Sequence, residues 1–270
     1  MSRDGVLLIH IDLSRIVVTF PQPDGGEFVA VNGFDLKVEK GEFVTIVGPS
    51  GCGKSTILSV VDGLIRPSGG KALIHGKPVI GPGSDRALVF QEFALLPWRT
   101  VESNIMMGLE LQHKLSRKKM RELVDHYVKM VGLRGFERHY PHQLSGGMRQ
   151  RVGIARALAV SPEILLMDEP FAALDAQTRE IMSAELLRIW EQEKKTVLFV
   201  THSIDEAVYL ADRIVVLSGC PGCVREIIPV GLARPRNLEI KDEPEFVHMR
   251  RHIWDLLEQE AKLQAGGGAP

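Results

Sequence analysis

The stretch at residues 48–56 constrains this 270-residue chain more than any other, because it reads Gly-Pro-Ser-Gly-Cys-Gly-Lys-Ser-Thr. Apolar runs at 43–47 and 57–61 flank it, which predicts a buried strand, a glycine-rich turn and the start of a helix. Glycines allow positive φ and let several backbone N–H groups converge, and a helix N-terminus adds partial positive charge. The stretch therefore predicts a phosphate-binding loop.

The residue types within this loop predict a nucleotide and its metal ion. Lys54 is placed to neutralise the β- and γ-phosphates, and Ser55 is placed to coordinate Mg²⁺. We expect the whole loop to line the nucleotide site, which then comprises Gly48, Pro49, Ser50, Gly51, Cys52, Gly53, Lys54, Ser55 and Thr56.

The composition predicts a globular protein with a sizeable core, since 44% of the residues are hydrophobic and 25% are charged. The formal net charge of −1 provides no basic field, so nucleic acid is not expected as a partner. No apolar run reaches membrane-spanning length, and the N-terminus lacks a signal-peptide cleavage site. We therefore expect a soluble, cytoplasmic protein.

The cysteines outside the loop, Cys220 and Cys223, form Cys-Pro-Gly-Cys. Two cysteines and a distant third are too few for a four-ligand zinc site, and no strand-then-helix context suggests a thioredoxin-like pair. Pro-Gly predicts a turn between two strands, and a labile disulfide across that turn is the alternative.

Short strands with tight turns predict antiparallel pairing at the start of the chain. We expect these strands at 6–11, 16–20, 28–31, 34–38 and 43–47, the last entering the sheet of the phosphate loop. The helix after the loop should end near residue 64, followed by strands at 71–74 and 87–90. We expect later strands at 164–167, 196–200, 213–217 and 224–228. A helix at 178–190 lies between the first two, and a helix that begins at the capping box 203–206 lies between the next two. This alternation implies a mostly parallel sheet covered on both faces.

Residues 92–158 interrupt the alternation and predict an inserted helical subdomain. Within this block the apolar residues of 117–131 recur on one helix face, with Ser116 as N-cap and Gly132 as terminator. The segment 91–98 before it carries large apolar residues where a loop is expected, namely Phe93, Leu95, Leu96 and Trp98. It is either a partner-binding surface or ordinary core packing.

Two carboxylates follow the buried strand at 164–167, at the edge where ligands bind in parallel sheets. Asp168 is placed to hold Mg²⁺ through water, and Glu169 to polarise an attacking water. A second anion-binding element begins at Leu144-Ser145-Gly-Gly, where a serine cap and two glycines open a helix expected at 148–158. Because the chain already has a phosphate loop, this second element suggests a site completed in trans.

Together these motifs resemble the ATPase subunit of ATP-binding cassette (ABC) transporters over about residues 6–235, and Leu-Ser-Gly-Gly is highly specific to that family. The resemblance implies an α/β P-loop NTPase fold with an N-terminal antiparallel β subdomain, a RecA-like parallel-sheet core and the inserted helical subdomain. Residues 1–235 would form the ATPase domain, and 236–270 a C-terminal helical extension with a flexible tail.

The resemblance also implies roles for individual residues around ATP and Mg²⁺. Two copies would bind ATP head to tail, between the loop of one and Ser145, Gly146 and Gly147 of the other. Gln91 would sense Mg²⁺ and the attacking water, Asp175 would cross the dimer interface, and His202 would contact the γ-phosphate. Phe20, which by itself is more typical of core packing, would stack on adenine.

A narrower resemblance, at 95–98, 146–156, 167–178 and 253–257, is to bacterial importers of nitrate, sulfonates and taurine. It implies a peripheral subunit on the cytoplasmic face of the inner membrane, bound to permease subunits and serving a periplasmic binding protein indirectly. The alternative is a soluble ABC-type mechanochemical ATPase acting on ribosomes or DNA; one cassette without heptads argues against it. A binding module without turnover would lack the catalytic carboxylate, but Glu169 is present.

Overall fold

The computed structural model describes residues 8–23, 25–91 and 94–266, and the chain divides into two compact units. Unit 1 comprises Met1–Gly83 with Thr196–Pro270, and unit 2 is Ser84–Lys195. In the described part of the chain, no helix combines the length and the apolar character needed to cross a membrane.

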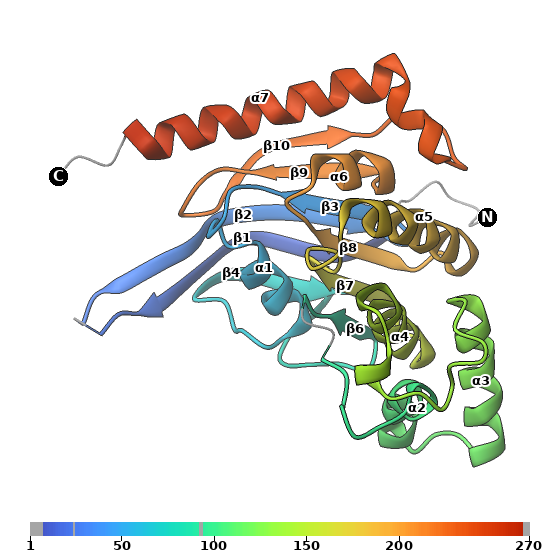
Figure 1. Ribbon diagram of the computed structural model, residues 1–270. Helices are drawn as coiled ribbons and strands as arrows, with labels where there is room; N and C mark the ends of the chain where they lie inside the picture. Colours follow the sequence, from blue (N-terminus) through green and yellow to red (C-terminus); the bar gives the residue numbers. More distant parts are fainter. Residues whose placement is uncertain (1–7, 24, 92–93, 267–270) are drawn as a thin grey trace. The chain divides into compact units, whose positions relative to one another are not determined.

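Unit 1 contains an antiparallel sheet whose two longest strands are β1 (Ile9–Pro21) and β2 (Glu27–Glu39), paired side by side in Figure 1. β4 (Gly69–Ile74) and β5 (Lys77–Pro78) complete the order β2-β1-β4-β5. The antiparallel pairing is confirmed, but the four short strands expected before residue 39 are two continuous ones. Arg15 and Gly33 adopt positive φ within them, and the register shifts near Arg15, so an expected break is a bulge.

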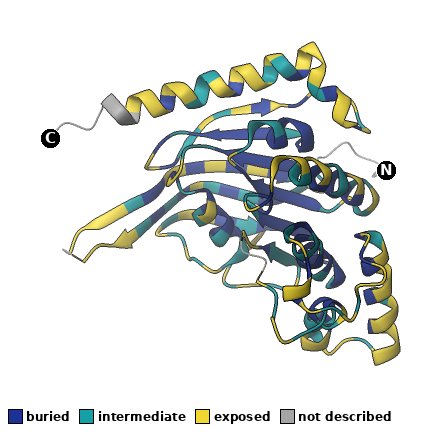
Figure 2. Ribbon diagram, viewed as in Figure 1, coloured by how far each residue is buried: buried dark blue, intermediate teal, exposed yellow. Residues whose placement is uncertain are grey.

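Unit 1 also contains the strand that leads into the phosphate loop. β3 (Phe43–Val47) lies between β8 (Thr196–Val200) and β9 (Arg213–Leu217), parallel to both. Every residue of β3 and β8 is buried, as the dark blue of Figure 2 shows, because a parallel sheet is covered on both faces. The bounds of both strands are those that the apolar runs predict.

Cys-Pro-Gly-Cys connects β9 to β10 (Val224–Pro229) as an antiparallel hairpin. The predicted turn is confirmed. Cys220 and Cys223 are free thiols in the structure, so the alternative of a disulfide across the turn is not what it contains.

The helices of unit 1 are α1 (Lys54–Asp62), α6 (Ile204–Leu210) and α7 (Pro244–Gly266), with the 3-10 helix η2 (Leu238–Asp242). α1 ends before residue 64 because Gly63 takes a left-handed conformation and its N–H donates to Val60. α7 packs on α6 and η2 and buries Phe246 and Ile253, while its other faces are largely exposed (Figure 2).

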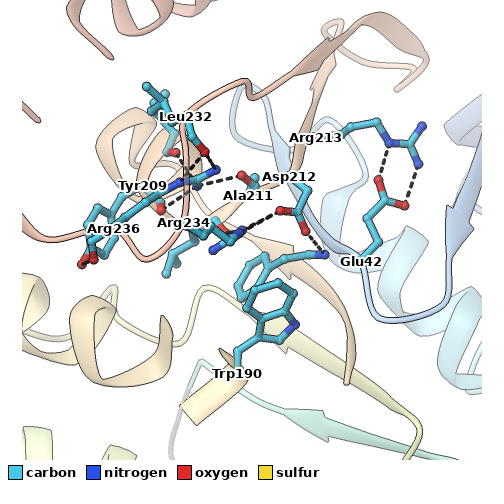
Figure 3. A network of polar contacts seen from close by, with 12 residues as sticks. Glu42, Trp190, Tyr209, Ala211, Asp212, Arg213, Leu232, Arg234 and Arg236 are labelled. Carbon is cyan, nitrogen blue, oxygen red and sulfur yellow. Dashed lines mark hydrogen bonds and ion pairs between the residues drawn. The ribbon is translucent and has the colours of Figure 1, made fainter. Parts of the chain in front are cut away.

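The chain between β10 and α7 is tied to the end of α6 by two arginines, the buried Arg236 and the half-buried Arg234, both drawn in Figure 3. The Arg236 guanidinium donates to the carbonyls of Tyr209 (2.9 Å) and Ala211 (2.8 Å), which close the C-terminus of α6. Arg234 pairs with Asp212 at 2.8 Å. A cation at a helix C-terminus satisfies its last carbonyls and complements its dipole, so this connection stabilises α6.

Unit 2 combines two parallel strands, β6 (Arg86–Val89) and β7 (Ile164–Asp168), with helices. These helices are α2 (Val101–Gln112), α3 (Arg117–Met130), η1 (Pro141–Gln143), α4 (Gly146–Ala159) and α5 (Ala176–Glu193). Ser116 caps α3 as predicted, by accepting from the Lys119 N–H. α4 and α5 start two residues earlier than predicted, because Gly146, Gly147, Ala176 and Gln177 belong to their first turns.

Candidate nucleotide site

The phosphate loop begins where β3 ends. Its glycines let its backbone pack closely against β2. Gly53 is the left-handed N-cap of α1, with φ 87°. A Cβ there would lie 2.8 Å from the Ala30 carbonyl oxygen and 2.7 Å from Val31 Cγ2. Only glycine fits this close approach to β2, so the loop conformation that the spacing predicts is dictated by sterics.

Lys54, the first residue of α1, is 7% exposed and points back into the loop. Its Nζ donates to the carbonyl oxygens of Gly48 at 2.9 Å and Pro49 at 2.8 Å. Both acceptors are neutral carbonyl oxygens, so these two hydrogen bonds bring no counter-charge to the buried side chain. A partly buried cation at a helix N-terminus fits a phosphate group, which is the chemistry predicted for this loop.

Cys52 occupies the interior of the loop. Burial raises the pKa of its thiol above the ordinary value, although the nearby Lys54 opposes that shift. The side chain is therefore a neutral thiol near pH 7 and contributes packing rather than charge.

The turn between β9 and β10 contacts the loop, which the sequence did not reveal. A Cβ at Gly222 would lie 2.0 Å from the Cys52 carbonyl oxygen, and the Gly222 N–H donates to Ala30 at 2.9 Å. The Pro-Gly turn thus packs against the backbone of the phosphate loop at Cys52. In the sequence, the glycine of the turn is the residue that could have indicated this close contact.

His202 emerges at the same sheet edge as the phosphate loop. In the β3–β8 register Ile46 is opposite Val200, so Gly48 and His202 each lie two residues beyond a paired position. Adjacent strands are about 4.8 Å apart. His202 is exposed there, where a side chain can reach a phosphate on the loop.

The predicted capping box after His202 is modified. Ser203 Oγ accepts from the Glu206 N–H at 3.3 Å, as expected. The Ser203 N–H instead donates to the Thr201 hydroxyl at 3.0 Å, and that hydroxyl donates to Glu206 Oε2 at 2.6 Å. The buried Thr201 hydroxyl thus links the Ser203 N–H to the Glu206 carboxylate, a contact that an ordinary capping box makes directly. These bonds hold the chain on both sides of His202.

Phe20 lies on β1 opposite Phe28 of β2, near the tip of the hairpin. Its exposed fraction is 37%, so it is not the core residue that its position in a strand would favour. Ala30, which contacts Gly53, lies two residues from Phe28 along β2. The aromatic pair therefore lies next to the part of the hairpin that contacts the phosphate loop.

In unit 2, Asp168 is the last residue of β7 and Glu169 follows with φ 44°, a left-handed conformation that is uncommon outside glycine. Val89 of β6 is opposite Met167, so Gln91 and Glu169 each lie two residues beyond a paired position. The predicted water-polarising carboxylate and the predicted metal-sensing amide thus emerge at one edge of this strand pair.

The Leu-Ser-Gly-Gly stretch forms the start of α4. Ser145 caps the helix by accepting from the Met148 N–H at 3.3 Å. A Cβ at Gly147 would lie 2.9 Å from Thr178 Cγ2, so the glycine lets α4 approach the start of α5. Asp175 caps α5 by accepting from the Thr178 N–H at 2.9 Å, which lowers the pKa of this exposed carboxyl.

The predicted residues are thus divided between the units. The phosphate loop, His202 and Phe20 belong to unit 1, and Gln91, Asp168, Glu169, Ser145–Gly147 and Asp175 belong to unit 2.

The segment 91–98 leaves Trp98 72% exposed, and Leu95 and Leu96 half-buried. Phe93 lies outside the described residues. The buried Asn104 of α2 holds the segment, because its amide accepts from the Leu96 N–H at 2.9 Å and donates to the Leu96 carbonyl at 3.2 Å. Sequence reasoning missed this asparagine, although a polar residue in an otherwise apolar helix turn is a usable signal.

Comparisons with known proteins identify the family of this chain. The family model "ABC transporter" matches residues 31–172. An uncharacterised ABC transporter ATP-binding protein of Methanocaldococcus jannaschii is 54% identical over 237 residues, covering 88% of this chain and 87% of that protein. The nitrate import ATP-binding protein NrtD of Synechococcus elongatus is 44% identical over 252 residues, 92% of this chain and 91% of that protein.

Solved structures show the same fold. The ATP-binding cassette MJ0796, a dimer in a post-hydrolysis state bound to ADP and Pi, matches with TM-score 0.73 and 34% identity, over 83% of this chain and all of that one. The cbiO1 protein of Clostridium perfringens, part of the cbiONQ transporter complex, matches with TM-score 0.74 and 25% identity, over 93% and 99%. This chain therefore belongs to the ABC transporter family, as an ATP-binding subunit with the P-loop ATPase fold that hydrolyses ATP.

Proposed function

We propose that this chain hydrolyses MgATP between two copies of itself, or between itself and a related ATPase, and energises an importer of a small anion. The anion is nitrate, an aliphatic sulfonate or taurine. The Lys54 ammonium, held on neutral oxygens at the edge of a parallel sheet, is the observation that carries the nucleotide chemistry. The relative named for nitrate import supports the class of anion.

In this proposal unit 1 holds the nucleotide. Residues 48–56 enclose the phosphates, with Lys54 neutralising the β- and γ-phosphates and Ser55 holding the metal ion. Phe20 stacks on the adenine, which its partial exposure permits. His202 contacts the γ-phosphate from the neighbouring strand and distinguishes ATP from ADP.

Unit 2 supplies the hydrolytic groups. Asp168, Gln91 and Ser55 are the residues that would hold Mg²⁺, which would neutralise charge on the phosphate oxygens. Glu169 accepts a proton from the attacking water, a contribution of about 10²–10⁴-fold for a well-positioned base. The left-handed backbone at Glu169 fixes the direction in which its side chain leaves β7.

The second copy completes each site with Ser145, Gly146 and Gly147, while Asp175 crosses the dimer interface. Helix α4 brings backbone N–H groups and the positive end of its dipole to the γ-phosphate. ATP then favours the closed dimer and hydrolysis reopens it, because the γ-phosphate bridges both copies. The dimeric cassette bound to ADP and Pi supports this arrangement.

The membrane partner is a pair of permease subunits, contacted through residues 91–98 and the helical subdomain at 92–158. The exposed Trp98 supports a binding role for that segment. Residues 1–235 form the ATPase domain, and 236–270 an extension outside it. The protein binds peripherally to the cytoplasmic face of the bacterial inner membrane, and a periplasmic binding protein selects the anion. The comparisons lend no support to a soluble factor acting on ribosomes or DNA.

Glu169→Gln tests the catalytic part. The variant should bind MgATP, lose turnover by about 10²-fold or more and accumulate as a dimer, since only the proton acceptor is removed. ATP binding, phosphate release and size-exclusion chromatography measure the three effects. Glu122→Gln, on the exposed face of α3, is the matched control. Turnover near the unmodified rate in Glu169→Gln would overturn the mechanism.

Tagged Glu169→Gln protein, captured with MgATP from detergent-solubilised cells, tests the transport part. A multi-span permease should be recovered. In the complex reconstituted with its binding protein, nitrate, taurine and an alkyl sulfonate are then compared for stimulation of ATP hydrolysis by the unmodified chain. Recovery of ribosomes or DNA complexes without a membrane protein would contradict the importer assignment, and stimulation by none of the anions would contradict the substrate class.

A further inference from the structure

Two histidines of unit 1 that take no part in the proposed ATP chemistry lie with one ring nitrogen of each within hydrogen-bond distance of the other. His10 of β1 is 1% exposed, and His75 lies in the exposed turn between β4 and β5. Their Nε2 atoms are 2.9 Å apart, and the ring centroids are 4.2 Å apart with a tilt of 59°. The rings therefore meet through one nitrogen each.

The backbone holds both rings in place. Ile11 of β1 is opposite Ile74 of β4, and the His75 N–H donates to the His10 carbonyl at 3.0 Å. Ile74 pairs with Lys77, so His75 and Gly76 are the two central residues of a tight hairpin. Both have positive φ, 51° and 73°, as a type I′ turn requires. His75 thus stands on a well-defined turn rather than on a long loop.

The second nitrogen of His10 is held by Thr196. Nδ1 of His10 contacts Thr196 Oγ1, and the same oxygen accepts from the Gly41 N–H at 2.9 Å. A hydroxyl oxygen has two lone pairs, so it can accept from Gly41 and from an Nδ1–H of His10 together. In that tautomer Nε2 of His10 carries a lone pair, and it lies 2.9 Å from Nε2 of His75. An oriented imidazole with its outer nitrogen hydrogen-bonded is the arrangement found behind metal-binding histidines.

We propose that His10 and His75 bind one divalent transition-metal ion such as Zn²⁺ through their Nε2 atoms. With metal–nitrogen bonds of about 2.0–2.1 Å, two cis ligands at a right angle lie about 2.9 Å apart, and two tetrahedral ligands about 3.4 Å apart. The observed 2.9 Å matches the first, and a small movement of the exposed His75 ring provides the second. Water or a further oxygen donor fills the other positions, and the ion clips β1 to the β4–β5 turn.

Zn²⁺ titration of tag-free, chelator-treated full-length protein by calorimetry tests this site. Cys220→Ser and Cys223→Ser are introduced together beforehand, so that thiolates do not contribute to binding. We expect one equivalent of Zn²⁺ to bind and the thermal midpoint to rise with Zn²⁺ concentration, because the ion binds the folded state only.

His75→Asn is the decisive variant, since asparagine tolerates positive φ and keeps the turn. It should weaken Zn²⁺ binding at least about tenfold, the lower end of the effect of an outer-shell change at a metal site. His113→Asn is its matched control, because His113 is also exposed and has φ 50°. Thr196→Val should weaken binding by a similar factor while both ligands remain.

Two results would overturn the site. If the protein binds no Zn²⁺ at one equivalent, the histidines only share a proton across the 2.9 Å contact. If binding is equally tight in His75→Asn, the ion binds elsewhere. Cu²⁺ added in place of Zn²⁺ gives an independent readout, since two imidazoles should produce coupling to two nitrogens in its electron paramagnetic resonance spectrum.

Discussion

Helices α1 and α4 both begin at elements predicted to bind phosphate, and they begin differently. The N-cap of α1 is Gly53, which has no side chain to satisfy the N–H groups of the first turn. The N-cap of α4 is Ser145, whose hydroxyl already accepts from Met148. Each helix also has a cation directed at the preceding loop, Lys54 on Gly48 and Pro49, and Arg149 on Leu144 at 2.6 Å.

The two helix starts differ in how their first-turn N–H groups are satisfied. Gly53 gives the first-turn N–H groups of α1 no side-chain acceptor, and the buried Lys54 ammonium lies in the same turn. At the start of α4 the exposed Ser145 already accepts from the Met148 N–H, so this cap forms without a ligand. We infer that the loop at 48–56 provides most of the affinity for ATP, and that Ser145–Gly147 respond to it in the dimer.

Lys54→Met should have the largest effect on ATP binding and turnover. Methionine retains the apolar stem, but it removes the charge that the phosphates require, so ATP turnover should fall by at least about 10²–10³-fold, as after loss of one preorganised donor. Nucleotide binding by fluorescence and phosphate release measure the effect. Lys71→Met, an exposed lysine on β4, is the control. Retained ATP affinity in Lys54→Met would mean that the loop is not the principal site.

Gly53→Ala and Gly51→Ala separate the effect of the close contact with β2 from the effect of the left-handed backbone. Both glycines have φ near 80°, but only the Cβ at Gly53 would meet backbone, at 2.8 Å from Ala30, whereas nothing lies within 4 Å of the one at Gly51. The left-handed conformation alone should cost about 1–2 kcal/mol in the free energy of unfolding. Urea unfolding should give a clearly larger loss for Gly53→Ala. Equal losses would show that the contact with β2 relaxes without cost.

Ser145→Ala should have a smaller effect on stability, about 1 kcal/mol, because it removes one helix cap. Urea unfolding and a binding isotherm for the single copy measure the change, and ATP affinity should be unaffected there. Turnover by the dimer should fall. Ser116→Ala, the cap of α3, controls for the loss of a cap alone. If Ser145→Ala weakened ATP binding by the single copy, the two elements would not be separable.

Asp175 should give the smallest effect, seen only in acid. Its pKa is lowered below 3.8 by the hydrogen bond from the Thr178 N–H, so the folded state favours the carboxylate. That stabilisation is present above the unfolded pKa and disappears as the pH falls through the folded pKa. Urea midpoints measured below pH 4 should therefore fall less steeply in Asp175→Asn than in the unmodified chain. Identical slopes would contradict the cap.

Local patterns predicted the elements whose signals lie among neighbouring residues of the chain. β3 and β8 were predicted to the residue because each is a short, continuous apolar run, and α3 to within one residue because its apolar face and its serine cap are both local. The long strands β1 and β2 were predicted in pieces. A strand continues through turn-forming residues as a bulge when a partner strand supplies its hydrogen bonds, and the β1–β2 pair contains such register shifts.

The sequence alone was enough to identify the motifs from which we predict the chemistry: a glycine-rich loop with Lys54, the carboxylates Asp168 and Glu169, and the serine cap Ser145. These depend on residue type and close spacing. Only the tertiary structure decided that Gly222 supports the loop, that Asn104 holds the segment before α2, and that His10 meets His75. The Gly222 and His10 contacts join residues far apart in the chain, and the Asn104 contact joins a buried helix residue to the loop before it. Strand register and packing, not local pattern, bring these residues together.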